Sequence, residues 1–269
     1  MRTIAIANQK GGCGKTTTAV NVAVSLAEKG KRTLLVDFDP QGHSTIGLGH
    51  NIDELPVTIY DAITKSEISI SEVILSTKFE QLDIAPSNVL LSGAEIELVS
   101  VVGREFVLTK EFKSVEDKYD MCIIDCPPSL SLLTLNALVA STDIIVPVQV
   151  HYYAMEGLKQ LFETVSIIKE HLHSCNVEIL GLLLTFVDKT TLLSRQTQTQ
   201  MREYFGGLVF ETVIHRSVRL AEAPSTGEPV LTYAPESRST AEYWALAEEI
   251  INGKVSAEQI DDAKALARR

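Results

Sequence analysis

Short apolar stretches rich in β-branched residues recur along the chain and alternate with longer segments whose apolar positions follow a helical period. Stretches of the first kind are typical of β-strands, and segments of the second kind are typical of α-helices. Because strands and helices alternate, we expect an α/β protein with a mostly parallel sheet. The pattern predicts strands at Thr3–Ala7, Arg32–Asp37, Leu82–Ala85, Met121–Asp125, Asp143–Val148, Ile179–Phe186 and Leu208–Ile214.

Several of these strands are hydrophobic throughout and do not alternate between apolar and polar residues. The stretches Ile144–Val148 and Ile179–Leu184 are examples. A strand of this type is expected where helices cover both faces of a sheet. The sequence therefore predicts a three-layer αβα sandwich around a mostly parallel, twisted sheet.

The chain shows no internal repeat, low-complexity stretch or Gly/Ser linker between Met1 and about Gly253. We therefore expect residues 1–253 to form a single domain. The first predicted strand begins at Thr3, which leaves no room for a DNA-binding domain before it. Residues 254–269 are expected to form a C-terminal tail with few large apolar residues (Ile260 and Leu266), for which a short helix is one alternative.

The composition, 45% hydrophobic and 22% charged over 269 residues, is that of an ordinary globular protein. The apolar runs are much shorter than the ~20 residues that span a membrane, and the first residues lack a signal-peptide pattern. The four cysteines lack the spacing of a zinc site and are expected to be reduced thiols (Cys13, Cys122, Cys126 and Cys175). These features favour a soluble, cytoplasmic protein.

A glycine-rich segment follows the first predicted strand. Residues 8–18 read Asn-Gln-Lys-Gly-Gly-Cys-Gly-Lys-Thr-Thr-Thr and precede a helical segment at Ala19–Glu28, which is the context of a phosphate-binding loop. Glycines let such a loop turn its N–H groups toward phosphate oxygens, and the helix N-terminus adds partial positive charge. The pattern predicts that Lys15 contacts the β- and γ-phosphates, that Thr16 ligates Mg²⁺ and that Thr17 donates to the phosphates. The remaining nucleotide-binding residues expected in the loop are Lys10, Gly11, Gly12, Cys13 and Gly14.

The loop departs from the usual G-x-x-x-x-G-K-[ST] pattern, because Gln9 stands where the first glycine belongs and Lys10 lies just inside the loop. The version found here, Lys-Gly-Gly-x-Gly-Lys-Thr, resembles the deviant Walker A motif of the ParA/MinD group of P-loop NTPases and is most similar to the ParA/Soj branch. The resemblance implies that Lys10 reaches across a dimer interface to the nucleotide of the partner. Both Lys10 and Lys15 are then catalytic.

Two predicted strands end in carboxylates. One ends at Asp37 and is followed by Asp39, within Asp-Phe-Asp-Pro-Gln; the other ends at Asp125, before Cys-Pro-Pro. The carboxyl ends of parallel strands form the ligand-binding edge of open α/β sheets. Asp125 is expected to hold Mg²⁺ as a Walker B aspartate. The resemblance implies that Asp39 positions the hydrolytic water and is a residue of the metal site, with Asp37 assisting around the metal; capping of the next turn is the alternative for both.

Two later segments also resemble the ParA/Soj branch. Residues 152–158 read Tyr-Tyr-Ala-Met-Glu-Gly-Leu and are similar to a segment near the nucleotide, which implies a ribose contact for Glu156; an ordinary helix-start glutamate is the alternative. Residues 214–225 are similar to the family's Ile-Pro-Arg-Asn-Val-Arg-Leu-Ser-Glu-Ala-Pro-Ser, but His215 replaces a proline and Ser217 replaces an asparagine. The resemblance implies that His215 and Ser217 border the adenine.

The net charge of −11 argues against a polyanionic partner unless basic residues gather locally. The stretch Phe186–Arg238 holds six basic and six acidic residues and is neutral, so the rest of the chain carries the negative charge. The resemblance implies that the ATP-bound dimer binds double-stranded DNA nonspecifically through this part of the chain. The candidates are Lys189, Arg195, Arg216 and Arg219, with helical salt bridges as the alternative for each.

The resemblance covers about residues 2–252 and implies a partition ATPase of the ParA/Soj type. Such a protein is a slow ATPase that requires ATP and Mg²⁺, dimerises around ATP, binds DNA on the nucleoid and is stimulated by a ParB-like partner. The alternatives are a ParA-like ATPase that positions a protein cargo, a binding module without turnover, and a membrane-cycling ATPase similar to MinD. The last predicts a basic amphipathic C-terminal helix, which residues 255–269 match poorly, so no membrane partner is expected.

Overall fold

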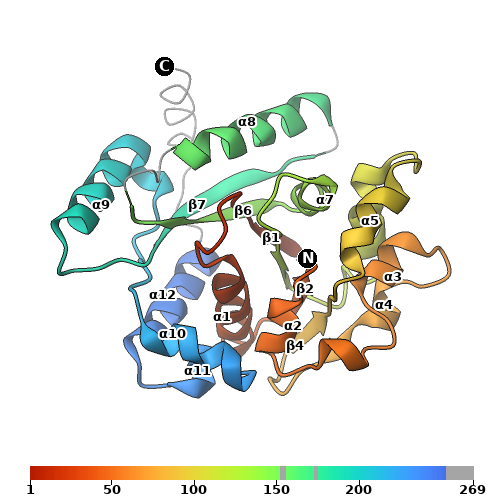
Figure 1. Cartoon of the computed structure of the whole chain (residues 1–269), viewed down its shortest axis with the longest axis horizontal. Helices are drawn as coiled ribbons and strands as arrows, with labels where there is room; N and C mark the ends of the chain where they lie inside the picture. The colour runs from red at the N-terminus through yellow and green to blue at the C-terminus, as the bar shows by residue number, and fades with distance from the viewer. Residues whose placement is uncertain (152–155, 173–174, 253–269) are drawn as a thin grey trace.

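A computed structural model describes residues 1–151, 156–172 and 175–252 of the chain (Figure 1). Within these residues seven strands form one sheet in the order β3-β4-β2-β5-β1-β6-β7. Every neighbouring pair is parallel except β3 and β4. The strands are β1 Arg2–Ile6, β2 Thr33–Asp37, β3 Leu75–Ser76, β4 Leu82–Ala85, β5 Met121–Asp125, β6 Asp143–Gln149 and β7 Glu178–Thr185.

Helices cover both faces of this sheet, as Figure 1 shows with α1 and α12 on one side and α7 and α8 on the other. The first layer contains α1 Lys15–Glu28, α10 Val218–Glu222, α11 Val230–Tyr233 and α12 Arg238–Asn252. The second contains α3 Ile59–Thr64, α4 Ile70–Val73, α5 Leu91–Leu98, α6 Val107–Phe112, α7 Leu132–Val139, α8 Glu156–His171 and α9 Leu192–Phe205. The remaining short helices are α2 His43–Gly47 and the 3-10 turns η1 Ile52–Glu54, η2 Arg104–Phe106, η3 Gly206–Leu208 and η4 Ala223–Thr226.

Successive residues of a strand face opposite layers. In β1, Ile4 and Ile6 pack in the core that contains α1 and α12, whereas Ala5 packs in the core that contains α7 and α8. Both faces of the strand are therefore removed from water, which explains why the run is apolar at every position. The predicted three-layer αβα sandwich is confirmed.

Six of the seven predicted strands occur within one residue of their expected bounds, but the strand expected at Leu208–Ile214 is wrong. This segment runs beside β7 and makes only two isolated parallel bridges there, Leu182 with Val209 and Val187 with His215. Phe210 donates its N–H to the carbonyl of Leu182, and Ile214 donates to Leu184, so four residues of the segment oppose two of β7. The two additional residues of this segment interrupt the regular hydrogen bonding that a strand paired with β7 would make.

The carboxylate of Glu249 on α12 accepts the backbone N–H groups of Glu211 and Thr212 at 2.7 and 3.1 Å. A helix side chain therefore satisfies the donors that a regular strand would have paired with β7. The one strand that the sequence did not predict, β3, has only two residues and is too short to show a pattern.

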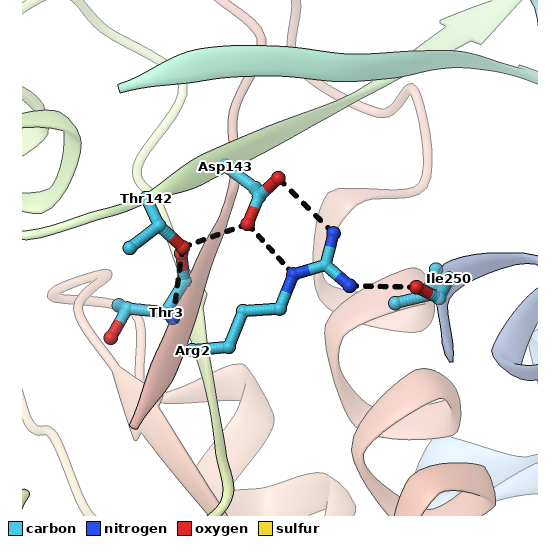
Figure 2. Close-up of polar contacts among 5 residues, drawn as sticks. All are labelled: Arg2, Thr3, Thr142, Asp143 and Ile250. Atoms are coloured by element: carbon cyan, nitrogen blue, oxygen red, sulfur yellow. Dashed lines mark hydrogen bonds and ion pairs between the residues drawn. The ribbon is translucent and has the colours of Figure 1, made fainter. Parts of the chain in front are cut away.

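The amino ends of the strands are joined by an ion pair on the edge of the sheet far from the glycine-rich loop (Figure 2). Arg2 at the start of β1 donates to both carboxylate oxygens of Asp143 at the start of β6, at 2.8 and 3.1 Å. Its remaining nitrogen donates to the carbonyl of Ile250 on α12 at 2.7 Å. Thr142 contacts both Asp143 and Thr3 through its hydroxyl. This cluster fixes the C-terminal part of α12 against the sheet.

The cysteine prediction is confirmed, since all four cysteines are buried free thiols. No helix among the described residues is long and apolar enough to cross a membrane. The tail expected at residues 254–269 and the segment 152–155 lie outside the described part of the chain, so the structure does not test the predictions made for them.

Candidate nucleotide-binding site

The glycine-rich loop lies between β1 and α1, at the carboxyl edge of the sheet. Gly12 and Gly14 have φ angles of 70° and 91°, which a residue with a Cβ rarely adopts. The loop is fixed on both sides. The side chain of Asn8 donates to the carbonyl of Pro147 in β6 at 2.7 Å, and the hydroxyl of Thr185 in β7 donates to the carbonyl of Cys13 at 2.8 Å.

α1 begins at Lys15, so Thr16 and Thr17 belong to its first turn. The free N–H groups of a first turn, with the N-terminal end of the helix dipole, favour binding of a phosphate. This explains why the predicted phosphate contacts of Lys15, Thr16 and Thr17 fall on consecutive residues.

The two lysines of the loop differ in their surroundings. Lys15 is 7% exposed, and its Nζ donates to the carbonyl of Lys10 at 3.2 Å, which holds the ammonium within the loop. Lys10 is exposed, and its Nζ donates to Gln149 at the end of β6 at 3.2 Å. The structure thus provides one buried and one exposed cation at the same loop.

Asp37 and Asp125 lie side by side, because they occupy paired positions at the ends of the adjacent strands β2 and β5. Both are fully buried. Burial is the main cause that raises the pKa of Asp37 to about 6 and that of Asp125 to about 7; the negative charge of Asp37 contributes to the shift of Asp125, and that of Asp39 to the shift of Asp37. A divalent cation would relieve this repulsion.

The donor set at Asp125 fits Mg²⁺. One carboxylate oxygen accepts the hydroxyl of Ser44 at 2.8 Å, whereas the other, Oδ1, is buried and has no hydrogen-bond partner among the described residues. The hydroxyl of Thr16 lowers the pKa of this carboxylate. A buried oxygen without a partner beside a hydroxyl is the kind of oxygen site that Mg²⁺ prefers, and Thr16 and Asp125 are the residues that would hold it.

Asp39 lies at the edge of the same group and is 8% exposed. Its Oδ1 accepts the backbone N–H of Gln41 at 3.0 Å, and in the described part of the chain no hydrogen bond reaches its other oxygen. Asp37 instead accepts both the N–H and the hydroxyl of Thr45, at 2.8 and 2.7 Å. Both aspartates therefore cap a turn, as the alternative expects, but Asp39 does so with one oxygen and keeps the other, which could orient a water.

Three hydroxyl residues support these carboxylates and were not singled out from the sequence: Ser44, Thr45 and Ser87. Ser87, which follows β4, donates to the carbonyl of Asp39 at 2.9 Å and presents its N–H to the hydroxyl of Thr45 at 3.0 Å. The signal that could have revealed Ser87 is its place just after a strand, at the same edge as Asp37 and Asp125. The adjacency of β4 and β2 was needed to interpret it.

The buried carboxylates predict how the stability of the nucleotide-free protein depends on pH. Their pKa values are raised from 3.8 in the unfolded chain, so the folded state binds more protons, and stability falls as the pH rises from about 4 to about 7. Replacing Asp37 by asparagine keeps an oxygen for Thr45 and removes one charge. We expect Asp37→Asn to raise Tm at pH 8 in EDTA by a few degrees, roughly 2–4 °C per kcal/mol.

Calorimetric scans of wild type and Asp37→Asn across this pH range would measure the difference, with Asp53→Asn as an exposed control. The difference should be small at the acid end and grow toward neutral pH. An unchanged or lower Tm for Asp37→Asn at pH 8 would contradict the assigned repulsion.

His215 and Ser217 line a cavity of about 140 Å³ together with Gly14 and Thr17. The predicted adenine contacts are therefore brought next to the loop. A second cavity of about 280 Å³ also reaches Thr17 and is lined by His43, Leu220 and Pro224. Glu156 is the first residue of α8, but its side chain lies outside the described part of the chain.

The four candidate DNA-binding residues are all exposed. Lys189 and Arg216 line one cavity, together with Arg238, whereas Arg195 lies on α9 and Arg219 on α10. Arg219 pairs with Glu222 at 3.1 Å, as the salt-bridge alternative expects, but its side chain stays exposed. Among the described residues, the other three have no ion-pair partner.

Four features define a P-loop nucleotide-binding protein. They are a mostly parallel sheet, a glycine loop before α1, a buried lysine followed by a threonine at the start of that helix, and a buried aspartate at the end of β5. The additional Lys10 places it in the deviant Walker A class. A family model described as an AAA domain matches residues 1–179.

The chain is 48% identical over 247 residues to the sporulation initiation inhibitor protein Soj of Bacillus subtilis, covering 92% of this chain and 97% of Soj. It is 44% identical over 250 residues to the chromosome partitioning protein ParA of Myxococcus xanthus, covering 93% and 88%. Its structure is similar to that of cobyrinic acid a,c-diamide synthase from Mycobacterium smegmatis with bound ATP analog and magnesium. The TM-score is 0.82 at 34% identity, covering 94% and 95% of the two chains. The chain belongs to the ParA/Soj family of ATPases.

Proposed function

We propose that this protein is a Mg²⁺- and ATP-dependent partition ATPase that dimerises around ATP, binds DNA nonspecifically as the dimer and is stimulated by a ParB-like activator. It would act in the cytoplasm, on the nucleoid, as a slow switch built on one domain, residues 1–253. The observation that carries this proposal is the second lysine of the loop. The ammonium of Lys10 is exposed and points to Gln149 at the end of β6, so it is accessible to a nucleotide bound to another subunit.

The residue roles follow from charge and position. Lys15 and the N–H groups from Gly11 to Thr17 bind the phosphates, while Thr16 and Asp125 hold Mg²⁺. Asp39 orients the attacking water from its free oxygen, with Asp37 fixing the segment through Thr45. Lys10 of the partner adds a cation at the γ-phosphate, which stabilises the charge that develops during phosphoryl transfer. Turnover would then require the dimer, and hydrolysis would end it.

The proposed DNA surface consists of Lys189, Arg195, Arg216 and Arg219. The chain carries a net charge of −11, so electrostatic attraction to DNA must come from a local surface of this kind. Each of the four would occur twice in a dimer, which doubles the phosphate contacts and makes the affinity depend on dimerisation. ATP then controls DNA binding indirectly.

Gel retardation of double-stranded DNA with ATP, with ADP and without nucleotide tests this function. We expect retardation only with ATP. Arg219→Glu should weaken it at every salt concentration and lower the salt slope by about two, because a dimer loses two phosphate contacts. Lys113→Glu, at an exposed lysine that follows α6, changes the net charge equally and should have little effect.

Retardation that is indifferent to both nucleotide and Arg219→Glu would reject the partition function. Co-sedimentation with anionic liposomes and ATP would separate the outcomes further, since binding there, and not to DNA, indicates membrane cycling.

A further inference from the structure

A hydrogen-bonded cluster joins the loop before α10 to helix α12. The carboxylate of Glu242 lies 2.6 Å from Nδ1 of His215 and accepts the backbone N–H of His215 at 3.0 Å. It also pairs with Nε of Arg238 at 2.7 Å. Nη2 of Arg238 lies 2.7 Å from Nε2 of His215. We call His215, Glu242 and Arg238 the latch.

The contacts determine the protonation state of His215. A guanidinium only donates hydrogen bonds, so Nε2 must accept from Arg238, and the proton is on Nδ1, which donates to Glu242. Burial lowers the pKa of His215, and the cations Arg238 and Lys189 lower it further, whereas Glu242 opposes them. A proton on Nε2 would break the bond from Arg238 and place two like charges side by side.

The latch fixes a short stretch of residues that lies between two cavities, which we call the wall. On one side of the loop is the 140 Å³ cavity that includes Gly14 and Thr17. On the other is a cavity of about 580 Å³ that includes Lys189 and Arg238. The residues that line both are Phe186, His215, Arg216, Ser217 and Ala221. A wall with space on both sides lacks packed neighbours that would fix its position.

Backbone hydrogen bonds fix this wall on the β7 side. Ile214 donates its N–H to Leu184 at 2.8 Å, Val187 donates to Ile214 at 3.1 Å, and Arg216 donates to Val187 at 3.0 Å. Phe186, which precedes Val187, has a φ of 54°, a strained conformation for a bulky side chain. α12 itself is held independently at its C-terminal part by Arg2 (Figure 2). The latch therefore adds side-chain contacts that tie the wall to a firmly held helix on the side away from β7's backbone hydrogen bonds.

We propose that His215, Glu242 and Arg238 are positioning residues that fix the wall of the nucleotide cavity and make ATP binding depend on His215 being neutral. The inference rests on the proposed nucleotide-binding role of the cavity beside Gly14 and Thr17.

The test compares Mg·ATP affinity by calorimetric titration at about pH 8 and about pH 5, on either side of an ordinary histidine pKa. At the higher pH, His215→Ala and Glu242→Gln should raise Kd about tenfold, as expected for losing a hydrogen bond to a charged group. At the lower pH, wild type should lose its higher affinity for Mg·ATP, and the ratio of variant to wild-type Kd should approach one. Comparing ratios cancels the titration of the nucleotide.

Glu249→Gln is the matched control. Glu249 is on the same helix and accepts two N–H groups of the same loop, but those residues do not line the nucleotide cavity. It should lower Tm without changing Kd. Arg238→Met removes the bond that a proton on Nε2 of His215 would break, so its Kd should already be raised at about pH 8 and should change little between the two pH values.

A ratio of Kd values that is the same at both pH values would overturn the proposal. So would an increase in Kd for Glu249→Gln equal to that of the latch variants, because the effect would then be one of general stability. If wild type binds ATP but Arg238→Met shows the same pH dependence of Kd as wild type, the latch proposal is wrong while the proposed function stands. If wild type binds no ATP at either pH, the proposed function fails first.

Discussion

Replacing Asp39 by alanine is expected to lower ATP turnover by about 10²–10³-fold while Mg·ATP still binds. The structure gives the reason. Asp39 has one oxygen engaged by Gln41 and one free, at the edge of the group formed by Asp37 and Asp125. Lys15, Thr16 and the loop N–H groups do not depend on Asp39, so the phosphate site should remain. Without hydrolysis, the dimer should persist.

Phosphate release and light scattering, both with ATP, measure the two effects. Asp39→Asn is the matched control, because an amide oxygen still accepts the N–H of Gln41 and preserves the turn. If charge on the free oxygen is what matters, the asparagine variant should be as inactive as the alanine variant. Near-normal turnover in Asp39→Asn would show instead that Asp39 only shapes the turn, and its proposed role in orienting the attacking water would be abandoned.

Lys15→Ala is expected to weaken ATP binding by about 100-fold, at the upper end for hydrogen bonds to a charged group. The buried ammonium of Lys15 is held within the loop by the carbonyl of Lys10. Lys10→Ala is the internal comparison. Its exposed ammonium donates to Gln149 in the described part of the chain, so the monomer should bind ATP almost normally but fail to form the ATP-dependent dimer.

Calorimetric titration measures binding in both variants, and light scattering with ATP measures dimer formation. The separation of the two losses is the decisive result. Undiminished dimer in Lys10→Ala would remove the main support for a nucleotide shared between subunits, whereas equal loss of ATP binding in both variants would place Lys10 in its own subunit's site.

Much of the site could be predicted because its residues are adjacent in sequence. The loop from Lys10 to Thr17 is local, and its glycines, lysines and threonines take their positions from backbone geometry and the first turn of one helix. Asp37 and Asp125 could be placed at the edge of the sheet because both end apolar strands. The pattern could not say that they are neighbours, since this depends on β2 and β5 being adjacent in the strand order.

The strand expected at Leu208–Ile214 was wrong for a related reason. Its apolar residues are buried, as a strand would bury them, but its spare N–H groups are accepted by Glu249 on a helix that follows much later in the chain. The same helix supplies Glu242 and Arg238 to His215. Hydrophobic pattern reports burial and does not reveal which distant group completes a hydrogen bond.

The sequence by itself therefore determined the glycine loop, its two lysines, the carboxylates that follow β2 and β5, and the αβα layering, because each is encoded within a few consecutive residues. Only the tertiary structure decided that Asp37 and Asp125 are buried side by side, that Ser44, Thr45 and Ser87 hold them, and that His215 is fixed by α12. These features depend on strand order and on contacts between segments distant in the chain. Such contacts form only when the sheet and its two helical layers pack together.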